Sequence, residues 1–247
     1  MTHGLGNGSG GTWRRLSAAA KLVPIAAFSV VAAISGGSPA QAQPNRALAD
    51  PPANIPAPSS MRLACSTGSA SSCERAAVRA IDAARATEGV VPLVLPADFA
   101  ALQPVGQLLV IADLERTDRG LPGFAGLSAQ LDKLAHAGAV ADTDPVGPSD
   151  TTWGSNWAGG ENAVLEADYD WMYNDGPKSF NVDCPAGGGG GCWGHRQNIL
   201  GDWGPSPSMG AAIATVQASG GQYLSMTQLF AATLAGPIAY RLPALSS

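Results

Sequence analysis

One seven-residue segment carries a histidine in a setting suited to chemistry: Gly194-His195-Arg196-Gln197-Asn198-Ile199-Leu200. His195 follows a glycine and opens a short segment of helical character. The free N–H groups at a helix start disfavour the imidazolium, and a neutral imidazole can act as a base or a hydrogen-bond partner. Two interpretations stay open. His195 either ties this turn to the core or contacts a ligand.

Two acidic residues are the candidate partners of this histidine. Asp168 falls within the apolar face of a helix expected over 161–173, and a carboxylate that faces a core must be paired or protonated. We expect Asp168 to be buried near the 194–198 turn, with Arg196 as its two-pronged partner. The alternative is a catalytic carboxylate. Asp175, in the loop after this helix, is the second acidic candidate.

Tryptophan is concentrated in the same stretch. All five tryptophans that follow residue 42 fall between 153 and 203, among acidic residues. Aromatic faces beside carboxylates can stack on sugar rings, and Trp157 and Trp193 are our candidate ligand contacts. The alternative is that these rings pack the long loops. A serine-hydrolase interpretation fails, because the chain has no Gly-x-Ser-x-Gly elbow.

The four cysteines form two local pairs, Cys65 with Cys73 and Cys184 with Cys192. Four cysteines permit three connectivities, and the equal short spacing favours the two local bridges. A zinc site would need further Cys or His at ligand spacing, which the sequence lacks. We therefore expect disulfides and neither a metal nor a cofactor.

The first 42 residues are typical of an export signal. Arg14, Arg15 and Lys21 precede and flank an apolar run, and Ala40-Gln41-Ala42 is a small-x-small cleavage site. The arginine pair leaves a twin-arginine route open beside the general one. Cleavage leaves 11 basic and 19 acidic residues, a net charge of −8. We expect a secreted or cell-envelope protein, without stable membrane insertion or nucleic-acid binding.

The remaining chain divides into a Pro-rich exposed linker at 43–62, a helical extension at 63–103 and a main domain at 104–247. Ser71-x-x-Glu74 and Gly89 bracket a first helix. Helices are expected from Pro104, from Ser128 to Gly138 and over 161–173, with 139–160 as a loop. A hairpin closes the chain, with strands at 211–217 and 222–230. Helices followed by strands predict an α+β fold.

Three motifs in this order resemble the bacterial branch of the CAP superfamily, the SCP-like extracellular proteins. They are Gly154-Ser155-Asn156-Trp157-Ala158-Gly159-Gly160, Trp171-Met172 and the His195 segment, against the family's GENIA-GG, WM and GHR-x-NIL. The Arg116 helix with Gly120-Leu121-Pro122 is similar to the family's R-x-x-x-G-L-P turn. The resemblance covers roughly 104–240. It implies an α-β-α sandwich and an extracellular, monomeric protein.

The resemblance also implies a cleft in which two His and two Glu can hold a divalent cation. Here the second His is His195, the first Glu falls on Ser155, and the second Glu falls near Asn174 or Asp175. The first His has no equivalent, because residues 137–153 contain no histidine. We therefore expect a binding module for a lipid, an envelope glycan or a protein. A hydrolase using His195 with a nearby Asp and a structural envelope protein are the alternatives.

Overall fold

The computed structural model describes residues 48–180, 190–232 and 237–240. The expected export signal and Cys184 lie outside these residues. The described residues form six α-helices and five strands, the α+β class that the sequence predicts. Among them, no helix combines the length and the apolar character that a membrane crossing requires.

Helices α1 (Ser59–Thr67) and α2 (Ala70–Glu88) form a hairpin closed by the predicted Cys65–Cys73 disulfide. Gly89 ends α2 in the left-handed conformation, as expected. The N-cap is Ser69 and not the predicted Ser71, because the Ser69 side chain already accepts a hydrogen bond from the Ser72 amide.

Both helices belong to the same compact unit as the sheet, and α2 packs on α5 (Val164–Met172). The segment before α1 is also attached to this unit. The Ile55 amide donates to the Tyr173 carbonyl at 3.0 Å, and Ala57 is buried. The described part of the linker predicted at 43–62 is mostly exposed, but it is anchored beside the end of α5 and forms helix α1 from Ser59 onward.

Strand β2 (Trp153–Gly159) replaces part of the loop predicted at 139–160. It pairs antiparallel with β4 (Gly221–Ala231), with Asn156 opposite Gln228. Its burial alternates, since Gly154, Asn156 and Ala158 face inward. Glycine, serine and asparagine are poor strand formers by composition, and pairing with β4 overrides that preference.

The predicted C-terminal hairpin is present as β3 (Ser208–Ala218) and β4, joined at Ala218 and Gly221. The five-stranded sheet has the order β2-β4-β3-β1-β5, in which β1 is Leu127–Ser128 and β5 is Ile238–Tyr240. Strand β1 is parallel to β3, and the other pairings are antiparallel.

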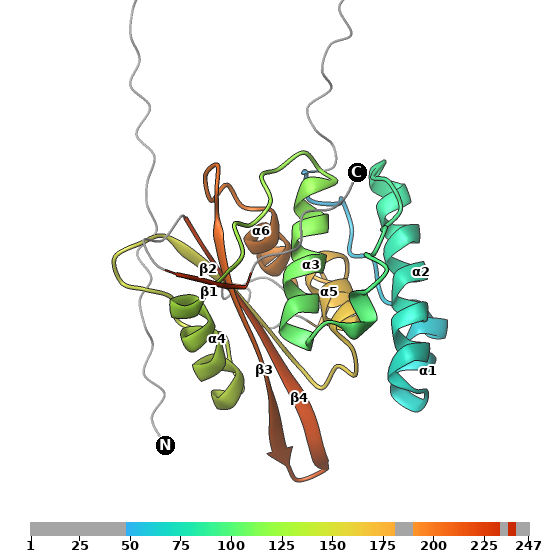
Figure 1. The fold of residues 1–247 in the computed structure, drawn as a ribbon. Coiled ribbons are helices and arrows are strands. Elements are labelled where there is room, and N and C mark those ends of the chain that lie inside the picture. Colours follow the sequence, from blue (N-terminus) through green and yellow to red (C-terminus); the bar gives the residue numbers. More distant parts are fainter. Residues whose placement is uncertain (1–47, 181–189, 233–236, 241–247) are drawn as a thin grey trace, which may run out of the picture. The chain divides into compact units, whose positions relative to one another are not determined.

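Helices cover both faces of this sheet (Figure 1). Helix α4 (Ala129–Ala141) packs on one face, where Leu131 and Ala135 meet Leu229. Helices α3 (Pro104–Thr117) and α5 pack on the other face, where Leu108 shares a core with Phe230. Pro104 occupies the first turn of α3, as predicted, and the short 3₁₀ turn Phe99–Ala101 precedes it.

Gly138 does not end α4 as the sequence predicts, since the helix continues to Ala141 and is capped by Asp142 in the left-handed conformation. A Cβ at Gly138 would lie 2.8 Å from Pro145. The glycine therefore permits a close approach between the helix and the following loop, which leads towards strand β2.

Buried ion pairs tie three helices together on the α3 side of the sheet. Glu88 of α2 accepts hydrogen bonds from Arg196 of α6 (Gly194–Leu200) and from Arg119, which follows α3. Arg85 of α2 and Arg119 both pair with Glu115 of α3. All five side chains are nearly or fully excluded from solvent. Breaking one partner of such a cluster leaves an uncompensated buried charge, so these residues hold α2, α3 and α6 in one arrangement.

Candidate functional site

The three sequence motifs meet where β2, α5 and α6 come together. The Asn198 side chain donates to the Ser155 carbonyl at 2.7 Å and to Asn156 Oδ1 at 3.1 Å. The Asn156 side chain in turn donates to the His195 carbonyl at 3.3 Å. The Trp171 indole of α5 donates to the Trp157 carbonyl at 3.0 Å. These bonds fix the backbone of His195 against strand β2.

Gly154 allows this close approach. A Cβ at this position would lie 2.5 Å from Asn198 Oδ1, which real Cβ atoms do not do. A larger residue would displace the Asn198 amide, whose hydrogen bonds join α6 to β2. The glycine of the first motif is therefore a packing requirement at the junction.

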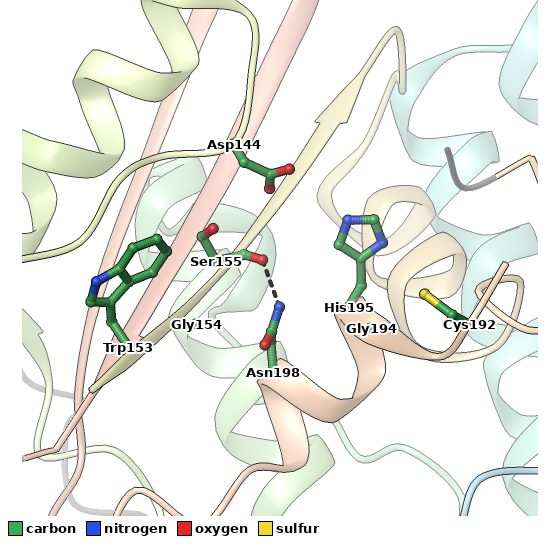
Figure 2. A pocket seen from close by; sticks show the side chains of 8 residues that line it. All are labelled: Asp144, Trp153, Gly154, Ser155, Cys192, Gly194, His195 and Asn198. Atoms are coloured by element: carbon green, nitrogen blue, oxygen red, sulfur yellow. Dashed lines mark hydrogen bonds between the residues drawn. The ribbon is translucent and has the colours of Figure 1, made fainter. Parts of the chain in front are cut away.

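A pocket of about 300 Å³ opens beside this junction. Its lining consists of Asp144, Trp153, Gly154, Ser155, Cys192, Gly194, His195 and Asn198. Figure 2 shows Trp153 at one end and His195 at the other, with Asp144 and Ser155 between them. Trp153 as a residue is 37% exposed, and its indole packs against Gly147, where a Cβ would lie 2.2 Å from the indole Cγ. The lining thus combines polar groups with one accessible aromatic ring.

The imidazole of His195 is oriented by the Asp175 carboxylate. His195 Nδ1 lies 3.0 Å from Asp175 Oδ1, and the Asp175 side chain is fully buried. The other edge of the ring faces the pocket, on the side where Asp144 lies (Figure 2). A histidine oriented by a buried carboxylate can present its remaining ring nitrogen to a bound molecule in a defined state.

The predicted ligand contacts divide into two groups. His195 and Ser155 line the pocket. Trp193 is buried and its indole packs on Gly176, and the Trp157 indole donates to Ser225 Oγ at 3.0 Å. Trp153, the third tryptophan that the sequence places in a loop of this stretch, is the one that lines the pocket. The disulfide state of Cys192 agrees with a second bridge, although Cys184 lies outside the described residues.

Asp168 is buried as predicted, but its predicted pairing with Arg196 is wrong. The guanidinium of Arg196 is bound to Glu88 and to the Met172 carbonyl instead. Neither carboxylate oxygen of Asp168 has a hydrogen-bond partner among the described residues. The helical periodicity correctly predicted that Asp168 faces the core. It could not predict that Arg196 pairs with Glu88, which lies far away in the sequence.

Complete burial raises the pKa of Asp168 well above its ordinary value, and the Glu115 carboxylate raises it further, against the lowering effect of Arg85 and Arg119. The neighbouring ion pairs show where the nearby positive charges are placed. The three arginines 85, 119 and 196 are matched by Glu88, Glu115 and Asp118. Burial and the Glu115 carboxylate therefore favour the protonated form of Asp168, which lies outside the described pocket lining.

Asp144 is the pocket residue that sequence reasoning missed. It lies in the loop between α4 and β2, next to Pro145, and no motif surrounds it. Only the path of this loop, fixed by the close contact between Gly138 and Pro145, brings its carboxylate opposite His195.

The donor set does not fit the four-ligand cation site that the family resemblance implies. Serine stands at 155, and the Asp175 carboxylate binds the Nδ1 side of His195 and the Arg196 amide, away from the pocket edge of the ring. Cys65, Cys73 and Glu166 also lie close together, but both thiols are consumed in the disulfide. No step of the chemistry is therefore assigned to a metal.

Comparison with protein-family models matched no family, and comparison with curated proteins and with solved structures likewise gave no match.

Proposed function

We propose that this chain is a secreted CAP-like domain that acts as an extracellular binding module, with the pocket between Trp153 and His195 as its binding site. Two features support the family. The three motifs contact one another directly, and helices cover both faces of the sheet, as an α-β-α sandwich requires. The first motif is rich in residues that disfavour strands, which is why the sequence predicted a loop where strand β2 lies.

Among the three ligand classes considered, an envelope glycan fits the pocket best. The observation that carries this choice is the lining itself: an accessible indole at one end and hydrogen-bonding side chains along the rest. An indole can cover the apolar face of a sugar ring, while Asp144, Ser155 and His195 contact its hydroxyl groups. A lipid tail would place hydrocarbon against these polar groups and give them no hydrogen bond in return for lost water, which costs free energy.

The experiment is a titration of the purified secreted chain with soluble fragments of bacterial cell-wall glycan, followed by tryptophan fluorescence and calorimetry. Saturable binding should weaken about ten-fold in Trp153→Ala, equal to about 1.4 kcal/mol. Phe180→Ala is the matched control, because Phe180 is an exposed aromatic residue outside the described pocket lining. Absence of binding, or equal affinities in both variants, contradicts the proposal.

A hydrolase is the second candidate, and the 3.0 Å contact between His195 and Asp175 favours it. A carboxylate-oriented imidazole is a common general base. In that case the glycan fragments would be cleaved, and His195→Ala would abolish cleavage while leaving much of the affinity. Unchanged fragments after prolonged incubation would leave binding as the function.

A further inference from the structure

The β3–β4 hairpin forms an uncharged projection of the sheet. From Trp203 to Tyr240 the sequence contains no Asp, Glu, Lys or Arg, although the chain carries a net charge of −5. Among the described residues, β2 pairs with β4 only over Ser225–Ala231 and β1 pairs with β3 only at Met209, so the half of the hairpin near the turn extends past its neighbours (Figure 1). An exposed edge of this kind is commonly protected by charged side chains, and this one has none.

One hydrogen bond shows which residues of β3 direct their backbone away from β4. The Ala211 amide donates to Asp132 Oδ1 of α4 at 3.0 Å, so it takes no part in the ladder with β4. Backbone direction alternates along an antiparallel pair, and the register of β3 on β4 runs without a break. The N–H and C=O groups of Ile213, Thr215 and Gln217 therefore point to the same outer side as those of Ala211.

These outward groups differ from the outward groups of β2, which are bonded. The carbonyls of Ser155 and Trp157 accept hydrogen bonds from the side chains of Asn198 and Trp171. On β3 the edge is capped at Ala211, and beyond it no described residue bonds to the outward backbone groups. Unpaired groups in a row along a strand are a template for another strand.

We propose that this edge of β3 is a docking surface for a second copy of the chain, with the two β3 strands pairing antiparallel about a two-fold axis at Thr215. In that register Ile213 lies opposite Gln217 of the other copy, and Thr215 lies opposite Thr215. Each pair exchanges two backbone hydrogen bonds, so the outward groups of one copy satisfy those of the other. This dimer takes the place of the monomeric state that the family resemblance implies.

The charge distribution favours a copy of the same chain as the occupant. Two chains that each carry a net charge of −5 repel one another over most of their surfaces, whereas no like charges meet along this uncharged edge. The paired segment is short, so the interface lies at the low end of interface sizes, and we expect a dissociation constant of about 0.1–1 mM.

Amide exchange with water, followed by NMR on the secreted chain, tests the pairing directly. The amides of Ile213, Thr215 and Gln217 should exchange about two- to three-fold more slowly at about 1 mM than at about 0.05 mM protein, because mass action fills the dimer. The amides of Ala214 and Val216 point to β4 and should not respond. Rates independent of concentration, or an equal response of all five amides, overturn the proposal.

Sedimentation equilibrium of charged variants separates edge pairing from association through another surface. Thr215→Lys places two like charges opposite one another at the axis and should keep the chain monomeric at about 1 mM. Gln222→Lys is the matched control, because it adds the same charge to the same hairpin on β4, away from the β3 edge, and should leave the dimer intact.

A mixture of Thr215→Lys and Thr215→Glu should restore association, which a merely distorted hairpin would not do, since the two opposite charges then face one another. A monomeric unaltered chain at about 1 mM overturns the proposal, as does a dimer that survives in Thr215→Lys or a mixture that stays monomeric.

Discussion

The guanidinium of Arg196 and the carboxylate of Glu88 form a two-pronged pair across the helix core, with both N···O distances at 3.0 Å. Glu88 is the last residue of α2, and Arg196 directly follows the histidine of the pocket. The pair therefore connects the helical extension to α6. The same carboxylate also accepts from Arg119, so two buried cations depend on one acid.

Removal of that acid should be severely destabilising. Glu88→Ala leaves Arg119 and Arg196 without their shared carboxylate, and we expect a loss of about 3–5 kcal/mol in the free energy of unfolding. Urea denaturation measures it. The control is Asp98→Ala, which alters an exposed acid near the 3₁₀ turn and should change little. Similar midpoints for the two variants would show that the ion pairs do not hold the helices together.

A second prediction concerns the protonation of Asp168. Because burial raises the pKa of Asp168 in the folded state, the folded chain retains a proton that the unfolded chain releases above an ordinary value of about 3.9. The stabilising contribution of this proton is complete below that value and is lost as the pH rises towards the folded-state pKa. Asp168→Asn, which needs no proton, should match the unaltered chain near pH 4 and become the more stable of the two at higher pH.

The measurement is the free energy of unfolding of both chains across about pH 4 to 8. Exposed Asp150→Asn should show no such divergence and serves as the control. If Asp168→Asn instead lost stability relative to the unaltered chain as the pH rose, Asp168 would be an ionised and paired carboxylate.

Local sequence signals were sufficient to predict where several helices and the final hairpin begin or end. Pro104 set the start of α3, Gly89 ended α2, and the Ser219-Gly220 turn located the final hairpin. His195 could be selected because its motif is compact in sequence.

What could not be predicted depends on residues far apart in the chain. Glu88 and Arg196 are 108 positions apart, and no periodicity links them. Asp144 enters the pocket only through the path of its loop, and β2 is a strand only because β4 pairs with it. Each of these features depends on tertiary contacts that outweigh the local preference of the residues involved.

The Cys65–Cys73 bridge is open to a direct stability test. Its closed loop is short, with a sequence separation of 8, and the loop-entropy relation gives about 2.5 kcal/mol for a ring of this size. Replacing both cysteines by serine should lower the free energy of unfolding by about that amount without changing glycan binding, because the bridge lies outside the described pocket lining. Peptide mapping of the unaltered chain tests the second pair: a peptide joining Cys65 to Cys192 would contradict the local pairing.

The last prediction concerns Asn54, in the segment that was expected to be a free linker. Its side chain donates to Asn174 Oδ1 at 2.8 Å and accepts the Gly176 amide at 2.9 Å. These two residues flank Asp175, so the segment supports the residue that orients the histidine. Asn54→Ala leaves the Gly176 amide without this acceptor, and we expect a loss of about 1 kcal/mol together with faster hydrogen exchange at Gly176.

Asp50→Ala is the matched control for this variant, because Asp50 lies on the same segment but pairs with Gln197 in an exposed contact at 2.7 Å. It should leave both the stability and the Gly176 exchange rate nearly unchanged, since an exposed hydrogen bond is readily replaced by water. In Asn54→Ala, the His195 ring signals should broaden as the Asp175 turn loosens, while the His136 signals remain sharp. Identical exchange rates in the two variants would mean that the N-terminal segment lies against the domain without supporting the pocket.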